Sequence, residues 1–209
     1  MKTLFAALLM ASTGLIGSFS EPVPLRMDVN HSNIGFAVPI MGGLSEVHGK
    51  FSEFEMDLRY DPDEVSASSV KVTIKAESID TGIEQRDEHL RTADFFDVAK
   101  HPDITFQSKR IENRNGSLYL HGDLTMHGVT KTITFPFRIT GKSVDEVKGR
   151  FVMGFAASLK LNRRDFGINY SHQSVPGFIG DEVTINLNLI TRSNPLPGLE
   201  KQAAKMEKK

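Results

Sequence analysis

The sequence predicts an all-β protein, an eight-stranded antiparallel barrel with a short helix between its third and fourth strands. Apolar residues recur at every second position in most segments between Ile34 and Leu189, a period typical of strands with one dry face. The links between these segments are short and carry turn residues, which favours antiparallel neighbours. Closure into a barrel would remove the exposed edges that an open sheet leaves.

The first twenty residues have the features of an export signal. Met1-Lys2 supplies a positive start, Leu4 to Ile16 is apolar, and Ser18 and Ser20 occupy the −3 and −1 positions before Glu21. The apolar run is short for a membrane span, although an uncleaved anchor is the alternative. We therefore expect residues 1–20 to be removed and the protein to be periplasmic or secreted.

Seven of the predicted strands alternate regularly. Their inward positions are every second residue of Ile34 to Val38, Val70 to Ala76, Ile104 to Phe106, Leu118 to Met126, Ile133 to Ile139, Phe151 to Leu161 and Val183 to Leu189. The remaining strand, Val47 to Leu58, changes parity partway. A β-bulge near Ser52-Glu53 would account for the change, because one extra residue restores the facing of the rest.

Turns and one helix separate these strands. Short turns are predicted at Asn115-Gly116, at His127-Gly128 and at Gly141-Lys142 with its following loop. A charged stretch from Glu84 to Arg91 predicts the helix, and Thr81 and Glu84 have the spacing of a capping box. Pro and Gly after Ser193 end any regular element. We expect one domain over residues 21–192 and a Lys-rich flexible tail over 193–209.

Composition excludes several function classes. The 25 basic and 26 acidic side chains nearly balance, so there is no electrostatic footprint for a nucleic-acid partner. Cysteine is absent, which excludes disulfides, thiolate catalysis and any Cys-containing metal site. The chain also lacks a Gly-x-Ser-x-Gly elbow and a phosphate-binding Gly-rich loop. We expect neither an enzyme nor a cofactor.

The seven histidines form no His-x-His or His-Glu-x-x-His spacing. The sequence therefore predicts surface histidines, including His121 and His127, and no metal. A zinc site assembled from distant strands stays open as an alternative, since spacing cannot reveal it. Asp87 and His89 form a poor acid–base pair, because residues two apart on a helix do not face each other. We expect the helix to be structural, with head-group recognition at a barrel mouth as the alternative.

The inward face is rich in phenylalanine. It contains Phe36, Phe51, Phe106, Phe135, Phe137, Phe151 and Phe155. An eight-stranded barrel is wide enough either to be filled by such side chains or to hold one small ligand. The pattern alone leaves a packed core and a lined cavity equally open.

Several segments resemble one family, in the same order, over about Leu25 to Thr191. They are Asp28 to Phe36, Val47 to Phe51, Ser78 to Gly82, Gln85 to Arg91, Asp94 to Val98, His101 to Phe106, Gly122 to Lys131, Asn162 to Gly167 and Gly180 to Val183. The chain is similar in these blocks to the YceI-like polyisoprenoid-binding proteins. The resemblance implies a lipocalin-like barrel that holds a long isoprenoid, a quinone-like lipid or a fatty amide or acid, as a carrier, a reservoir or a stress-related protein.

The inward pattern and the resemblance together predict which residues bind the ligand. The apolar lining is expected at Phe36, Val38, Phe51, Val72, Ile74, Phe106, Leu120, Leu124, Phe135, Phe137, Phe151, Phe155 and Leu159. A polar head is expected near the helix, at Arg86, Asp87, His89, Arg91, Phe95 and Phe96. The family often has a His after the first strand where this chain has Pro39-Ile40, which favours a less polar ligand or another head-binding group.

Two other functions stay open at this point. One is a stress or interaction protein whose cavity is incidental, and the other is a hydrolase or isomerase that acts on a lipid. A dimer is possible, and the sequence leaves the oligomeric state undetermined.

Overall fold

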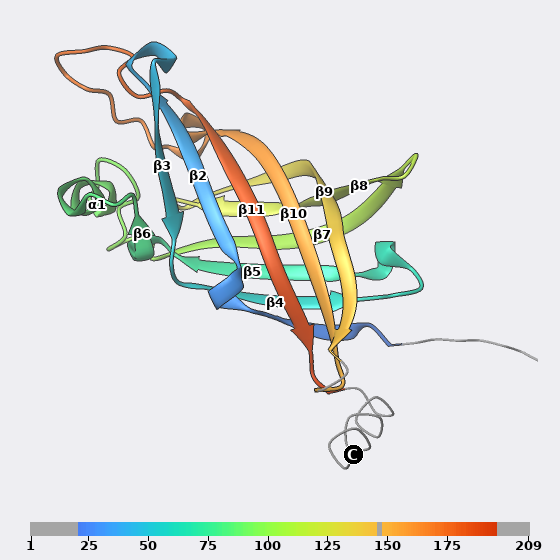
Figure 1. The fold of residues 1–209 in the computed structure, drawn as a ribbon. Helices are drawn as coiled ribbons and strands as arrows, with labels where there is room; N and C mark the ends of the chain where they lie inside the picture. Colours follow the sequence, from blue (N-terminus) through green and yellow to red (C-terminus); the bar gives the residue numbers. More distant parts are fainter. Residues whose placement is uncertain (1–20, 146–147, 196–209) are drawn as a thin grey trace, which may run out of the picture.

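The computed structural model describes residues 21–145 and 148–195, and eleven strands of this part form one antiparallel sheet that closes on itself (Figure 1). The predicted signal peptide and most of the predicted tail lie outside the described residues. The ring consists of β1 (Val23–Met27), β4 (Phe54–Tyr60), β5 (Ser69–Lys75), β7 (Asp103–Arg114), β8 (Ser117–Met126), β9 (Val129–Asp145), β10 (Arg150–Asn162) and β11 (Glu182–Ser193). The predicted eight-stranded barrel with a helix between its third and fourth strands is confirmed.

The ring is closed by β1, a strand that the sequence analysis did not count. β1 pairs with β4 on one side and with the last residues of β11 on the other. It has only five residues, one of them Pro24, so its alternation is too short to detect. The first predicted strand, Ile34 to Val38, lies instead in β2 (Asn33–Ile40), outside the ring.

β11 carries a second group of strands beside the ring. Its first half pairs with β2, which pairs with β3 (Ser45–Phe51), which in turn meets the short β6 (Ile79–Asp80). In Figure 1, β2 and β3 extend past the barrel at the end where α1 (Glu84–Arg91) and β6 lie. These strands therefore form a wall around one open end of the barrel.

The change of parity at Ser52-Glu53 is a strand break, so the predicted β-bulge was wrong. β3 ends at Phe51, and β4 begins at Phe54 with different partners. The two linking residues bond to Ser78: Ser52 N–H donates to its carbonyl (3.1 Å) and Glu53 N–H to its hydroxyl oxygen (3.0 Å). The segment that the sequence analysis placed in a single strand thus passes from the outer wall to the ring.

Two of the three predicted turns are confirmed. Asn115-Gly116 and His127-Gly128 have positive φ at both residues, as the two-residue hairpin turn of type I′ requires. Gly141-Lys142 is not a turn, because β9 continues through it to Asp145. A register shift lies there instead, where Gly154 pairs with Gly141 and Phe155 with Ile139, leaving Thr140 as the extra residue of a bulge.

The helix has the predicted bounds, but the capping box was wrong. Its N-cap is Ile83, with no side-chain bond to the first turn. Thr81 is engaged elsewhere: its N–H and its hydroxyl donate to the carboxylate of Asp87, and its hydroxyl accepts from Arg86 Nε at 2.7 Å. The hydrogen-bond acceptor for the Thr81 N–H, which precedes the helix, is therefore the buried carboxylate of Asp87 and not that of Glu84.

Short 3-10 helices and one helix complete the secondary structure of the described residues. The 3-10 segments are η1 (Val29–His31), η2 (Met41–Gly43), η3 (Val65–Ala67), η4 (Ala76–Ser78) and η5 (Arg163–Phe166). No helix in the described ranges is long and apolar enough to cross a membrane. β11 ends at Ser193, one residue past the predicted domain end, and the side chain of Ser193 is buried there.

Candidate functional site

The interior of the ring holds an inner cavity of about 200 Å³. Its lining is almost wholly apolar and comes from β2, β3 and every strand of the ring. The two hydroxyl side chains in the lining already have partners: Tyr60 accepts from Lys142, and Ser68 accepts from the Asp61 N–H at 2.9 Å. An apolar cavity without free polar groups stays dry and accepts apolar ligands, as an engineered cavity of about 150 Å³ does with benzene.

Most of the predicted apolar residues line this inner cavity. They are Phe36, Phe51, Val72, Ile74, Phe106, Leu120, Leu124, Phe135, Phe137, Phe155 and Leu159. The structure separates two others from them. Val38 lines a second cavity, and Phe151 lines neither, because its ring stacks on Tyr60 with centroids 6.4 Å apart in a packed cluster around Met153.

The second space, which we call the mouth cavity, has a volume of about 390 Å³. It lies between the wall of β2 and β3, the helix α1 with the residues after it, and the segment 163–181. The two cavities share lining residues, namely Phe36, Phe51, Met126, Leu161 and Ile185. They are therefore adjacent compartments that differ in polarity.

Four of the six predicted head-group residues line the mouth cavity: Arg86, His89, Phe95 and Phe96. Asp87 and Arg91 do not. Asp87 is 4% exposed and accepts the bonds from Thr81. Arg91 is directed at the backbone, with Nε 2.9 Å from the Glu77 carbonyl and Nη2 3.2 Å from that of Ile79. Both hold α1 against the strands below it.

Three polar side chains of the mouth cavity were missed by the sequence analysis: Arg163, Tyr170 and His172. They belong to η5 and to the irregular segment after it, where no periodicity marks an inward side. Tyr170 packs against the rings of His89 and Phe95, with centroids 5.1 and 4.7 Å away. His172 has a buried Nδ1 without a hydrogen-bond partner, which is the arrangement that a polar ligand atom would complete.

Arg163 is an anchor of this segment. Its side chain donates to the carbonyls of Gly180 (3.0 Å) and Ile168 (2.8 Å) and to the Asp181 carboxylate (2.8 Å). Burial lowers the pKa of its guanidinium, against the opposing effect of Asp181. All three nitrogens are engaged, so Arg163 shapes the mouth cavity and offers no free charge to a ligand.

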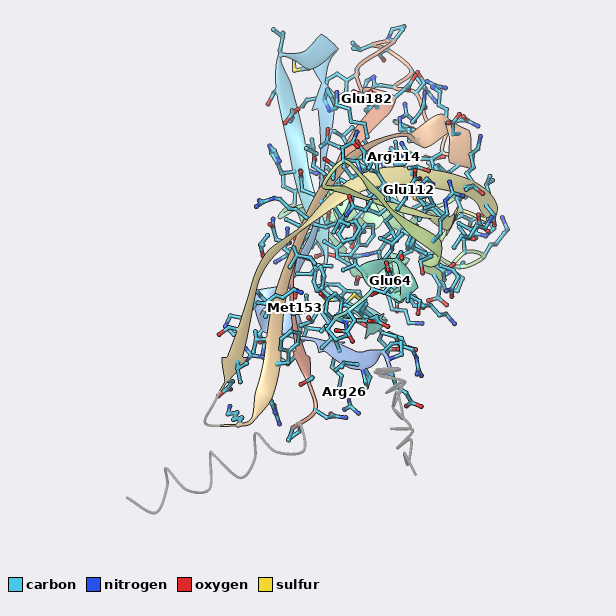
Figure 2. The ribbon with its side chains drawn as sticks, turned by 90° about the vertical axis from the view of Figure 1, so that its right-hand side faces the viewer. Arg26, Glu64, Glu112, Arg114, Met153 and Glu182 are labelled. Carbon is cyan, nitrogen blue, oxygen red and sulfur yellow. The ribbon has the colours of Figure 1, made fainter. Side chains whose placement is uncertain are left out.

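Two histidines that the sequence predicted to lie on the surface, His121 and His127, are not exposed. His121 is buried, between Glu112 (2.9 Å from Nε2) and Thr134 (2.8 Å from Nδ1). Glu112 is also held by Arg114, and the hydrogen bonds from Arg114, with a smaller contribution from His121, lower the pKa of that carboxyl to about 2. Figure 2 shows Glu112 and Arg114 close together on β7. His127, at the turn after β8, is half-buried.

Among the described residues, one group has the composition of a metal site. Asp97, His101 and His127 each offer one ligand atom, and these atoms lie within 4.8 Å of one another. The group lies beside the mouth cavity, next to Phe96 and Met126 of its lining. Within the described ranges, the mouth cavity itself is lined by no Ser, Thr, Cys or carboxylate side chain.

Comparison with known families and sequences gives a consistent result. A family model described as YceI-like domain matches residues 25–191. A UPF0312 protein of Pseudomonas aeruginosa is 34% identical over 170 residues, covering 80% of this chain and 88% of the relative. A UPF0312 protein of Vibrio cholerae is 39% identical over 139 residues, covering 66% of this chain and 72% of the relative.

Solved structures share the fold. BcnA of Burkholderia cenocepacia has a TM-score of 0.70 at 23% identity, covering 78% of this chain and 98% of its own. A YceI protein of Campylobacter jejuni has a TM-score of 0.65 at 29% identity, covering 72% of this chain and 87% of its own. A polyisoprenoid binding domain from Saccharophagus degradans has a TM-score of 0.61 at 14% identity, covering 82% of this chain and 99% of its own.

Proposed function

The chain belongs to the YceI-like family, and on this basis we propose that it is an exported lipid-binding protein. Its ligand is a long-chain isoprenoid or a lipid of similar shape, with the tail in the inner cavity and the head in the mouth cavity. The observation that carries the proposal is the apolar inner cavity, which shares five lining residues with a more polar compartment. The Saccharophagus degradans structure of the same fold is described as a polyisoprenoid binding domain, which supports this ligand class.

The inner cavity favours a hydrocarbon tail on energetic grounds. Its lining includes aromatic rings such as Phe106 of β7 and Phe135 of β9, two strands that both pair with β8, and the centroids of these rings are 5.8 Å apart. Each methylene group transferred from water to such surroundings contributes about 0.8 kcal/mol. A polar group placed there would lose its hydrogen bonds to water without finding a partner, at a cost of several kcal/mol.

The mouth cavity favours an uncharged polar head. Its buried cation, Arg163, is already paired with Asp181 and two carbonyls. Arg86 donates to the hydroxyl and the carbonyl of Thr81. The groups that remain for a ligand include the unpartnered His172 Nδ1, the Tyr170 hydroxyl and the second ring nitrogen of His89, whose Nε2 bonds to Asp94. An alcohol, phenol, quinone or amide matches these groups better than a phosphate or a free acid does.

The same geometry supports binding in preference to catalysis. The His89 ring is 2.8 Å from Asp94 and packs edge-on against Phe95 and Tyr170. No serine, threonine or cysteine of the described residues shares this cavity with it, so a nucleophile for hydrolysis is not in place. We propose that His89 positions the head group, and that its replacement by Ala alters ligand retention or stability without abolishing a reaction.

Organic extraction of the purified protein, followed by mass spectrometry, tests the proposed function. We expect one long-chain lipid per chain, unchanged after prolonged incubation. An empty extract that stays empty when the protein is offered polyprenols or quinones would favour a protein with an incidental cavity. Conversion of the lipid to a product, lost in His89→Ala, would favour the enzyme.

A further inference from the structure

Asp97, His101 and His127 come together from two parts of the chain that are not adjacent in sequence. Asp97 and His101 lie in the turns between α1 and β7, and His127 lies in the tight turn between β8 and β9. The two imidazole rings have centroids 4.8 Å apart. Within residues 21–145 and 148–195, this is the one set of three His, Cys, Asp or Glu side chains close enough to share a metal ion.

The ring of His127 is fixed by a hydrogen bond to the backbone. Its Nδ1 is 3.1 Å from the carbonyl oxygen of Phe166 in η5. A carbonyl can only accept, so Nδ1 carries the proton and the lone pair is on Nε2. Metal-binding histidines commonly donate their second nitrogen to a backbone carbonyl or a carboxylate in this way, which fixes the tautomer and the ring orientation.

The carboxylate of Asp97 is held in place by a lysine. Lys100 donates a hydrogen bond to its Oδ2 at 2.8 Å. The Asp97 side chain is 13% exposed, whereas that of Lys100 is 73% exposed. The lysine can therefore move into solvent while the carboxylate stays beside the two rings.

The backbone brings the two histidines close to each other. The ring of His101 lies on Gly128, where an added Cβ would be 2.7 Å from His101 Cε1. Asp97 and His127 both have positive φ (45° and 51°), a conformation that non-glycine residues adopt infrequently. The turn thus places His127 beside His101 with no side chain between them.

We propose that Asp97, His101 and His127 bind one divalent cation of the zinc class, with water completing the coordination. Two imidazoles and a carboxylate are a ligand set that Zn²⁺ and Co²⁺ accept. Ligand atoms in a tetrahedral zinc site are roughly 3.3 Å apart, given bonds of about 2.0–2.1 Å. The present separations of up to 4.8 Å therefore shrink by small side-chain rotations when the cation enters.

The cation would fasten the segment after α1 to the barrel. Phe95 and Phe96 of this segment line the mouth cavity, and Phe96 packs edge-on against Phe51 at 5.9 Å. His127 lies in the turn between β8 and β9, and its partner Phe166 lies in η5, which follows β10. The proposal thus concerns the stability of the mouth and stands independently of which lipid the barrel holds.

Titration of the metal-free full chain, without a histidine tag, with Zn²⁺ and Co²⁺ tests the site. Calorimetry should give one cation per chain, and bound Co²⁺ should show the visible absorption of low-coordinate cobalt. His101→Ala, Asp97→Asn and His127→Asn should each weaken binding at least tenfold, since each removes a ligand. Asn tolerates the positive φ at position 127, and circular dichroism verifies that each variant is folded.

Two controls make the result specific. His48→Ala removes an exposed histidine that is paired only with Glu46, and its affinity should equal that of the wild type. Lys100→Met removes the competing ammonium group and should bind the cation at least as tightly. A wild type that binds no cation, or a folded His101→Ala variant with unchanged affinity, would overturn the proposal, as would weaker binding in Lys100→Met.

Hydrogen exchange tests the fastening role separately. The cation should slow amide exchange in residues 94–101 of the wild type and leave the same residues unaffected in His101→Ala. Stoichiometric binding without any added protection in this segment would show that the cation does not fasten the mouth.

Discussion

At two places in the sheet a glycine leaves room for a phenylalanine ring. Gly49 of β3 is opposite Phe36 of β2, and an added Cβ would be 2.3 Å from Phe36 Cζ. Gly122 of β8 is opposite Ser108, yet the ring of Phe106 lies over it, and an added Cβ would be 2.4 Å from Phe106 Cζ. At both places the far end of the ring lies over the glycine. The absence of a side chain therefore keeps the ring against the wall and leaves the interior open.

Gly49→Ala is expected to weaken lipid binding. The new methyl group displaces the ring of Phe36, which lines both cavities, into the space where they meet. Affinity for a polyprenol should fall severalfold, measured by fluorescence competition. Gly141→Ala is the matched control, because nothing lies within 4 Å of its added Cβ and its φ is not positive. Equal affinity in the two variants would contradict this role of Phe36.

Phe137→Ala and Phe155→Ala distinguish a lined cavity from a packed core. Both rings line the inner cavity. Phe166 is the control: it is 2% exposed and lines neither cavity. Truncation of a packed Phe costs about 3–5 kcal/mol, which we expect for Phe166→Ala in urea unfolding. Without lipid, Phe137→Ala and Phe155→Ala should lower the free energy of unfolding by less than this, because empty space already adjoins these rings. Both variants should also weaken lipid binding.

The opposite result is also informative. A full loss of 3–5 kcal/mol in both cavity variants, with unchanged lipid affinity, would mean that the barrel is filled by its own side chains. The proposed function would then fail.

Glu112 makes stability depend on acid pH. The hydrogen bonds from Arg114 lower its pKa from 4.5 to about 2 in the folded protein. A lowered folded-state pKa stabilises the protein fully above the unfolded value, and this stabilisation is lost as the pH falls from about 4.5 toward 2. Glu112→Gln should therefore lower the melting temperature at pH 7 and make little difference at pH 2. A difference that is the same at both pH values would contradict the assignment.

At the scale of elements, α1 depends on a buried carboxylate more than on its own sequence propensity. Asp87 accepts the Thr81 N–H at 3.0 Å and the Thr81 hydroxyl, and Arg86 bonds to Thr81 from the next position. This network fixes the start of the helix to the strand β6 that precedes it. The helix in turn carries Arg86 and His89 to the mouth cavity.

Asp87→Ala is expected to destabilise the protein by about 1–3 kcal/mol, because it leaves the Thr81 N–H without its acceptor. Asp87→Asn keeps one acceptor oxygen and should cost less. Glu88→Ala, at an exposed position of the same helix, should remain within about 0.5 kcal/mol of the wild type. Equal losses for Asp87→Ala and Glu88→Ala in chemical unfolding would show that the network contributes nothing.

At the scale of the whole molecule, β11 joins the two parts of the fold. It pairs with β10 along its length, with β2 by its first half and with β1 by its last residues. The ring that encloses the inner cavity and the wall that encloses the mouth cavity therefore share one strand. This arrangement places the dry compartment and the more polar compartment end to end.

The sequence predicts a cleavage site before Glu21. Export is expected to remove residues 1–20, because the apolar stretch and the Ser18 and Ser20 positions match a signal peptide. N-terminal sequencing of the protein recovered from the periplasm or medium should start at Glu21 or within a few residues. A mature protein that retains Met1 would contradict the prediction, and Ser20→Pro, which blocks such sites, should cause the precursor to accumulate.

The sequence by itself determined the class of fold and most of the barrel lining. Alternation along a strand is a local property, so the inward positions of β5, β8 and β10 could be identified without their partners. The same holds for the α1 bounds and for the Asn115-Gly116 turn, whose residue types select its conformation.

Only the tertiary structure decided which strands close the ring and where the interior is empty. Alternation shows that a side chain points inward and not what it meets there: Phe155 borders a cavity, whereas Phe151 packs on Tyr60. Tyr170 and His172 lie in an irregular segment without a period, so nothing local marks them as part of the mouth. Asp97 and His127 are far apart in sequence, and their proximity arises from packing between elements, which the pattern within either element does not contain.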